Sequence, residues 1–195
     1  MTVIGITGSS GSGKTTLTNI LAEELKAKVI YADEVVKKMQ VKGNPYFEEI
    51  VQAFGNEILD IQGELNRKKL ANIIFTNKEK KAILNKLTQE YVVKEIHNQI
   101  NTAKEDYIIL DAPLLIESGL NKICNKIIAV ICSKKVQIER IIKRDKIDIQ
   151  TAKERLEAQQ INEFYKTNAD YIVENDGGEY DKFVGRIRNS LQNMQ

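Results

Sequence analysis

The 195-residue sequence contains little of several residue types that catalytic and metal sites often need: one histidine, two cysteines, two prolines and no tryptophan. With a single histidine, His97, the sequence offers almost no candidates for a Ser-His or Cys-His nucleophilic site. We therefore interpret His97 as a surface or packing residue. Cys124 and Cys132 are eight residues apart around an apolar segment and have no further metal-ligating partners. They are predicted to be free thiols, buried or half-buried, in a reducing compartment.

Neither charge nor hydropathy points to a membrane or a nucleic acid. The 29 basic and 27 acidic residues leave a formal charge of +2, without a polybasic tract. No apolar run approaches the roughly 20 residues of a bilayer span, and the first residues lack the pattern of a signal peptide. We therefore expect a soluble, cytoplasmic protein, and a 42 % hydrophobic content at this length fits one buried domain.

The most informative segment that is present is a phosphate-binding loop. Gly8 to Thr15 read G-S-S-G-S-G-K-T, a complete G-x-x-x-x-G-K-[ST] pattern between an apolar strand candidate and a helical pattern over 16–25. Its glycines let backbone N–H groups approach phosphate oxygens, Lys14 supplies a charge for the β and γ phosphates, and the Thr15 hydroxyl suits Mg²⁺. The pattern implies a bound nucleoside triphosphate. A flexible Gly/Ser linker would explain neither Lys14 and Thr15 nor the apolar flanks.

Five short apolar runs predict the strands of a parallel α/β sheet, at residues 3–6, 28–31, 107–110, 126–131 and 171–173. Several are continuously hydrophobic, as strands covered by helices on both faces are, and helical patterns between them supply the crossovers. We expect the strand that leads into the loop to be central, with the nucleotide at the carboxyl ends of the strands. Residues 34–101 are mainly helical and too long for a simple crossover, which predicts an inserted helical subdomain.

Two carboxylates stand where predicted strands end. Asp111 occupies the place of a Walker B aspartate, where it would hold Mg²⁺ directly or through water; alternatively, it caps a turn before Pro113. Asp33 closes the second strand and could take the proton of an acceptor hydroxyl that attacks the γ-phosphate. The alternative for Asp33 is N-capping of the helix that follows.

Arg140 and Arg144 are four residues apart, so a helix places both guanidinium groups on one face. Arg155 recurs on a second helical pattern after a break at Asp148. This arrangement predicts a mobile helix-turn-helix lid over about 138–165, whose arginines would stabilise charge on the transferred phosphoryl group. A solvated helix surface is the alternative interpretation.

These residues together resemble the dephospho-coenzyme A kinase family over nearly the whole chain. The resemblance rests on the segments Thr7–Thr16, Ala32–Asp33, Leu65–Arg67, Pro113–Leu120, Gln137 with Arg140 and Arg144, Ala152 with Arg155 and Gln159, and Ala169–Asp170 with Asn175. The Pro-Leu-Leu-x-Glu-Ser block after Asp111 is its most distinctive part.

The resemblance implies an α/β P-loop NTPase three-layer fold in a single domain over 1–195, with a five-stranded parallel sheet, a helical substrate-binding insertion and a helical lid. It also implies transfer of the γ-phosphoryl of ATP to the 3′-hydroxyl of dephospho-coenzyme A, with ATP and Mg²⁺ as cofactors. The small molecule is the expected partner, without nucleic acid or membrane.

Matching positions imply the residue roles. The catalytic group would comprise Asp33 as general base, Lys14, Arg140 and Arg144. The nucleotide would contact Gly8, Gly11, Ser12, Gly13, Lys14, Thr15, Thr16 and Asn175. The acceptor would contact Arg67, Gln89, Pro113, Leu114 and Glu117, while Mg²⁺ would be held by Thr15 and Asp111.

Three segments depart from the family pattern. The usual Gly-Gly-Ile-Gly-Ser-Gly-Lys-Ser loop has serines at 9 and 10 and a threonine at 15 in this chain. The family's Asp-Ala-Asp is Tyr31-Ala32-Asp33, which keeps only the second carboxylate. A His-Pro pair expected in the helical insertion is Gln89-Glu90.

Three other functions would account for part of this pattern. A P-loop kinase for a nucleoside or nucleotide would use the same loop, base and lid, but the block at 113–120 argues against it. A P-loop GTPase or ATPase switch would be expected to carry an Asn/Thr-Lys-x-Asp or ABC-type signature, and the sequence has neither. A nucleotide-binding relative without useful catalysis is the third alternative, motivated by Tyr31, Gln89 and Glu90.

Overall fold

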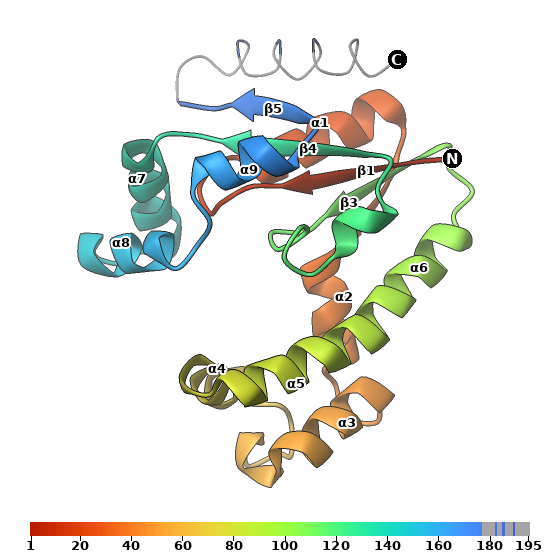
Figure 1. Cartoon of the computed structure of the whole chain (residues 1–195), viewed down its shortest axis with the longest axis vertical. Coiled ribbons are helices and arrows are strands. Elements are labelled where there is room, and N and C mark those ends of the chain that lie inside the picture. The colour runs from red at the N-terminus through yellow and green to blue at the C-terminus, as the bar shows by residue number, and fades with distance from the viewer. Residues whose placement is uncertain (177–181, 183–184, 186–188, 190–195) are drawn as a thin grey trace. The chain divides into compact units, whose positions relative to one another are not determined.

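The computed structural model describes residues 1–176, 182, 185 and 189. The chain divides into two compact units, one of residues 1–29 with 104–195 and one of residues 30–103. We call the first the sheet unit and the second the helical unit. Figure 1 labels most of the helices and strands of both.

The sheet has five strands: β1 (Thr2–Thr7), β2 (Lys28–Tyr31), β3 (Tyr107–Asp111), β4 (Lys126–Ile131) and β5 (Tyr171–Glu174). Their order is β2-β3-β1-β4-β5, and β1 pairs in parallel with both β3 and β4, while β5 pairs in parallel with β4. The strand that leads into the phosphate loop is therefore central. The predicted parallel five-stranded sheet is confirmed, with each strand within one residue of its expected bounds.

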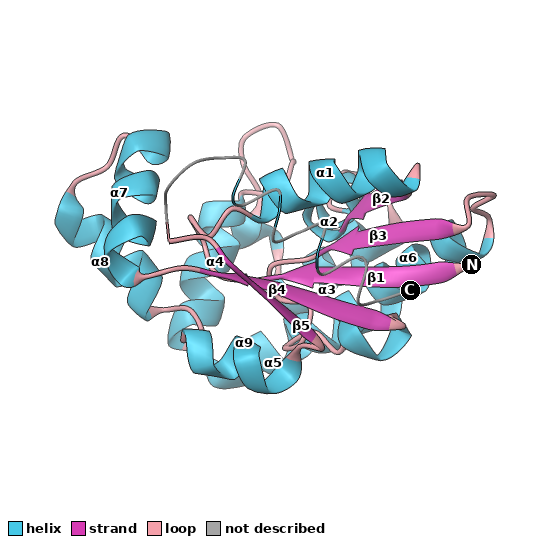
Figure 2. Ribbon diagram, turned by 90° about the horizontal axis from the view of Figure 1, so that it is seen from above, coloured by secondary structure: helices cyan, strands magenta, loops and turns pink. Residues whose placement is uncertain are grey.

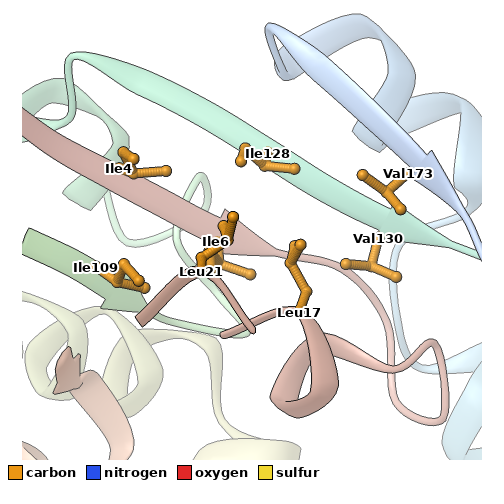
Figure 3. Close-up of a cluster of buried hydrophobic side chains, with 8 residues drawn as sticks. All are labelled: Ile4, Ile6, Leu17, Leu21, Ile109, Ile128, Val130 and Val173. Carbon is orange, nitrogen blue, oxygen red and sulfur yellow. The ribbon is translucent and has the colours of Figure 1, made fainter. Parts of the chain in front are cut away.

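Helices cover both faces of this sheet. Helix α1 (Lys14–Leu25) lies on one face and α9 (Asn162–Asn168) on the other (Figure 2). Leucines of α1 pack on isoleucine and valine side chains of β1, β3, β4 and β5; Figure 3 shows the cluster of Ile4, Ile6, Leu17, Leu21, Ile109, Ile128, Val130 and Val173. The alternate residues of β4, Ala129 and Ile131, pack with Tyr165 of α9. Both faces of β4 are thus apolar, which explains its unbroken hydrophobic run.

The remaining helices of the sheet unit follow β3 and β4. A 3₁₀ turn, η3 (Leu120–Ile123), precedes β4, and α7 (Lys134–Asp145) and α8 (Ile149–Glu157) follow it. Helix α7 ends at Asp145, and its C-cap, Lys146, has a left-handed conformation with φ 53°. The Asp148 side chain then accepts a hydrogen bond from the Thr151 N–H at 2.9 Å and so caps α8. The break expected at Asp148 is therefore a helix cap.

The helical unit runs from the end of β2 to Ala103. Its elements are α2 (Ala32–Met39), α3 (Pro45–Phe54), η1 (Asn56–Ile58), α4 (Arg67–Thr76), α5 (Lys78–Thr88), η2 (Gln89–Val93) and α6 (Lys94–Asn101). Asn44, Asn66 and Asn77 cap α3, α4 and α5 with their side-chain oxygens. Element η2 is a π-helical turn that joins α5 to α6 without a break. In the described part of the chain, no helix has the length and apolar character needed to cross a bilayer.

Candidate nucleotide and acceptor site

The phosphate loop links the end of β1 to the start of α1. Gly8, Gly11 and Gly13 have φ angles of 137°, 77° and 105°, which L side chains rarely adopt. A Cβ atom on Gly11 would lie 2.9 Å from the backbone oxygen of Gln137, and one on Gly8 would collide with the backbone oxygen of Val130. The loop therefore needs glycine at both positions for conformation and for close packing against β4 and α7.

Four side chains at the end of the loop face different surroundings. The Lys14 Nζ donates to the backbone oxygens of Gly8 at 2.6 Å and Ser9 at 3.2 Å, so the ammonium lies across the loop. Thr15 is exposed and Thr16 half-buried in the first turn of α1. The buried Ser12 hydroxyl has no hydrogen-bond partner among the described residues. A positive helix end, an ammonium group and an available hydroxyl form the donor set that phosphate requires.

Asp111 is the last residue of β3 and is only 8 % exposed. Its Oδ2 accepts a hydrogen bond from the Thr18 hydroxyl of α1 at 2.7 Å. This bond turns the carboxylate towards the helix that carries Thr15. Within the described residues, no group of three or more His, Cys, Asp or Glu side chains could hold a metal ion by itself. A hydroxyl and a carboxylate nevertheless fit Mg²⁺, which is commonly held by one or two protein groups with phosphate and water.

Arg140 of α7 packs directly on the phosphate loop. Its Nη1 donates to the backbone oxygens of Gly11 at 3.0 Å and Ser12 at 3.3 Å. Its Nη2 donates to the Asn175 Oδ1 at 3.1 Å, and the Asn175 Nδ2 donates to the Ser12 oxygen at 2.6 Å. The solvated-face interpretation is therefore wrong for Arg140, whose guanidinium joins α7, the loop and the end of β5.

Arg144 and Arg155 share one carboxylate. The Arg144 Nε lies 2.7 Å from Asp145 Oδ1, and the Arg155 Nη1 lies 2.7 Å from Asp145 Oδ2. The hydrogen bond from Arg144 is the main cause that lowers the pKa of Asp145. Arg144 Nη2 also donates to the Ser10 hydroxyl at 3.1 Å. Both arginines are half-exposed or more, so this cluster links α7 to α8 at the surface of the loop.

Two glutamines hold the loop in ways that the sequence did not reveal. The buried Gln137 donates from Nε2 to the Ser9 hydroxyl at 2.7 Å and to the Cys132 oxygen at 3.1 Å. The Gln159 Oε1, just after α8, accepts from the Ser10 N–H at 2.7 Å. Both glutamines carry part of the family resemblance. Spacing alone gave them no role, because the loop residues that they bond lie more than 120 residues away.

The segment after β3 carries the distinctive Pro-Leu-Leu-x-Glu-Ser block. Leu115 is fully buried and anchors it, whereas Leu114 is 62 % exposed and Glu117 is exposed. The Pro113 oxygen accepts a hydrogen bond from the Thr7 hydroxyl at 3.2 Å, which ties the block to the end of β1. The block therefore presents Leu114 and Glu117 at the surface of the sheet unit.

Asp33, Arg67 and Gln89 belong to the helical unit, whereas the other predicted site residues belong to the sheet unit. Strand β2 ends at Tyr31, and Asp33 is the second residue of α2, with an exposed carboxylate. The N-capping alternative for Asp33 is wrong, because the helix begins at Ala32 with Tyr31 as its N-cap. Gln89 is the first residue of the π turn η2 and is exposed.

The cysteines and the histidine take packing positions. Cys124 is half-buried and Cys132 buried, and both are free thiols as expected. Burial raises the pKa of the Cys132 thiol against the opposing effect of Arg140. His97 is half-buried on α6.

Solved structures support the fold. A protein from Thermus thermophilus is 22 % identical to this chain, with a TM-score of 0.86 over 99 % of this chain and 97 % of the other. The dephospho-CoA kinase of Campylobacter jejuni is 29 % identical, with a TM-score of 0.68 over 98 % of this chain and 96 % of the other. A shikimate kinase from Acinetobacter baumannii, 17 % identical with a TM-score of 0.58, covers 100 % of this chain and 95 % of its own. Together they bear out the P-loop kinase fold.

Sequence comparisons define the family. The sequence model of the family described as dephospho-CoA kinase matches residues 2–181. The dephospho-CoA kinase of Fusobacterium nucleatum is 41 % identical over 182 residues, which are 93 % of each chain. That of Pseudoalteromonas translucida is 38 % identical over 174 residues, 89 % of this chain and 82 % of the relative. With a phosphate loop, a strand-end aspartate and an arginine-bearing helix in place, the chain belongs to the dephospho-CoA kinase family.

Proposed function

We propose that this chain transfers the γ-phosphoryl group of ATP to the 3′-hydroxyl of dephospho-coenzyme A, giving coenzyme A and ADP. The observation that carries the proposal is the near full-length match to the family together with Arg140 seated on an intact phosphate loop. The acceptor oxygen would form the new bond to phosphorus as the bond to the β-phosphate oxygen breaks. Two free cysteines are in keeping with action in the cytoplasm.

The loop would hold the phosphates of ATP. Gly8, Gly11, Ser12, Gly13, Lys14, Thr15 and Thr16 supply backbone N–H groups, hydroxyls and an ammonium at the positive end of α1. Thr15 and Asp111 would hold Mg²⁺, which neutralises charge on the β and γ phosphates when bound. The Thr18 bond to Asp111 supports this assignment because it fixes the carboxylate beside α1.

Asp33 would accept the proton of the attacking hydroxyl. Its carboxylate is exposed in the first turn of α2, so no other side chain has to move to uncover it. The proton would pass from the 3′-hydroxyl to a carboxylate oxygen as the oxygen attacks. Positioning contributes more than the base in loose phosphoryl transfer, so losing the base is expected to slow the reaction without abolishing ATP binding.

Two arginines of α7 would stabilise the transferred group. Arg140 already contacts loop oxygens and Asn175, which places its guanidinium group beside the loop that would hold the phosphates. Arg144 contacts the loop through Ser10 and is otherwise held by Asp145. We propose that α7 and α8 form the lid, over about 138–165, and that closure excludes water so that ATP is not hydrolysed.

The helical insertion, about 34–101, would bind the acceptor. Arg67 offers a guanidinium group and Gln89 an amide, both at the surface of the helical unit. Pro113, Leu114 and Glu117 of the sheet unit are proposed to contact the acceptor as well. Gln89 stands where the family has histidine, so its amide would replace an imidazole as the polar contact.

The test measures ADP formation from ATP and Mg²⁺ with and without dephospho-coenzyme A, beside adenosine, uridine and nucleoside monophosphates. We expect dephospho-coenzyme A alone to stimulate ADP formation, with coenzyme A as the product. Asp33→Asn is expected to lower kcat by about 10²- to 10⁴-fold while ATP binding persists. Stimulation by a different acceptor, or by none, would contradict the proposal.

A further inference from the structure

Four polar side chains form a continuous chain of hydrogen bonds inside the helical unit. They come from four different places: Gln40 just after α2, Tyr46 in α3, Arg67 at the start of α4 and Thr88 at the end of α5. Tyr46 is 1 % exposed, so its hydroxyl needs a partner inside the unit. The chain ends beside Gln89, where the π turn begins.

The direction of every bond in this chain can be assigned. The Thr88 hydroxyl donates to the Leu84 backbone oxygen at 2.8 Å, which uses its single proton. In the 2.7 Å contact between the two hydroxyls, Tyr46 must therefore donate to Thr88. Arg67 has only donors, so its Nε donates to the Gln40 Oε1 at 3.0 Å. Gln40 is the second hydrogen-bonding partner of the Tyr46 hydroxyl. Because the Gln40 Oε1 already accepts from Arg67, its amide nitrogen is the group that donates to the Tyr46 oxygen.

This assignment fixes one side of the Arg67 guanidinium group and leaves the other side open. Its Nε is held by Gln40, while Nη1 and Nη2 have no hydrogen bond or ion pair among the residues that the structure describes. Arg67 is also exposed. A guanidinium held by Nε presents two parallel donors, the geometry that binds two oxygens of one phosphate.

We propose that Gln40 and Tyr46 are positioning residues that aim the Nη1 and Nη2 atoms of Arg67 at a phosphate of the acceptor. The inference rests on the proposed function, because dephospho-coenzyme A would bring a diphosphate of its own to the helical unit, separate from the phosphates of ATP. A free arginine side chain must lose much rotational freedom when it binds phosphate. The bond to Gln40 removes part of that freedom beforehand, and the buried Tyr46 hydroxyl holds Gln40 in the required orientation.

The alternative is that the four residues only stabilise the packing of the helices. If so, substituting them would weaken folding and would affect the binding of ATP and of the acceptor alike. A positioning role acts through Arg67. Substituting Tyr46 or Gln40 would then weaken only acceptor binding, and this effect would disappear when Arg67 is absent. The two roles are therefore separable by comparing kinetic constants in two genetic backgrounds.

The experiment compares wild type, Tyr46→Phe, Gln40→Met and Arg67→Ala, with each of the first two variants also made in the Arg67→Ala background. Tyr91→Phe is the matched control, since its ring centroid lies 5.9 Å from that of Tyr46 while its hydroxyl interacts with Glu49. Steady-state rates give kcat and the two KM values, and calorimetric titration gives the Kd for dephospho-coenzyme A. Urea unfolding reports the stability of each variant.

We expect Tyr46→Phe and Gln40→Met to raise KM and Kd for dephospho-coenzyme A by about three- to tenfold, as for one hydrogen bond lost. The KM for ATP and kcat are expected to stay within about twofold of wild type, and Tyr91→Phe to match wild type. In the Arg67→Ala background, neither substitution should raise the KM further.

Two results would overturn the inference while leaving the proposed function intact. One is an active enzyme in which both substitutions leave the acceptor KM unchanged. The other is a rise of the same size with and without Arg67, which would assign Tyr46 and Gln40 to packing alone. If wild type shows no response to dephospho-coenzyme A, the proposed function fails first and the inference fails with it.

Discussion

Replacing Thr18 by valine tests whether the bond from α1 secures the carboxylate of Asp111. Thr18 is fully buried and Asp111 is 8 % exposed, and their oxygens are 2.7 Å apart. Valine has nearly the same shape as threonine, so the substitution removes the hydroxyl without opening a cavity. A hydrogen bond to a charged group contributes about 1.5–3 kcal/mol, and we expect Thr18→Val to lower the free energy of unfolding by that amount. For a chain of this size, the Tm would fall by about 3–12 °C.

Thr18→Ser is the matched control, because it keeps the hydroxyl and loses one methyl group, at a cost of about 1 kcal/mol. Urea unfolding followed by circular dichroism measures both variants. The reasoning predicts that valine is more damaging than serine. If Thr18→Val were as stable as wild type, or more stable than Thr18→Ser, the bond would not secure the carboxylate.

Three further predictions concern buried groups of the sheet unit. A Cβ on Gly5 would lie 2.7 Å from the side chains of both Cys124 and Leu115, so Gly5→Ala is expected to lower the free energy of unfolding by about 1–3 kcal/mol in urea titrations. Burial raises the pKa of Cys124 to about 12, so a disulfide reagent at pH 8 should modify it at least about tenfold more slowly in the folded protein than in urea; equal rates would contradict this. Burial, with a smaller effect of Glu117, raises the pKa of Tyr165 to about 12. Because an unfolded tyrosine ionises near pH 10, stability should fall as pH rises from about 10 to 12, and Tyr165→Phe should reduce that loss.

The sheet and the phosphate loop could be predicted because their signals are local. A strand covered on both faces is apolar along nearly its whole length, as β4 is from Ile127 to Ile131, and the loop pattern specifies glycine, lysine and threonine within eight residues. The central position of β1 followed from the rule that open α/β sheets bind nucleotides where the strand order reverses. Membership of the family rested on residues spread over the chain.

The partners of the site residues could not be predicted, because they are distant in the sequence. Thr18 and Asp111 are 93 residues apart, and Ser10 and Gln159 are 149 residues apart. A threonine or a glutamine on an amphipathic helix has the same pattern whether it faces solvent or a buried acceptor. The roles assigned to Asp33 and the acceptor-binding residues stay predictions until they are measured.

The π turn at Gln89–Val93 was also missed. Residues 78–101 have a helical composition throughout, and one extra residue in a single turn leaves no mark in that composition. The turn begins at Gln89 and joins α5 to α6, and Glu90, where the resemblance led us to expect proline, lies within it.

The bonds from α7 and α8 to the phosphate loop also link two binding equilibria. Gln159 accepts a hydrogen bond from the Ser10 N–H, and Arg140 donates one to the Gly11 oxygen. A conformational change in the loop would therefore alter the bonds that tie it to α7 and to the residues just after α8. By thermodynamic reciprocity, a molecule that binds these helices more tightly when ATP is present tightens ATP binding by the same factor. A molecule that bound beside α8 with different affinity in the presence and absence of nucleotide would therefore change the affinity for nucleotide by the same factor, without contact to the nucleotide.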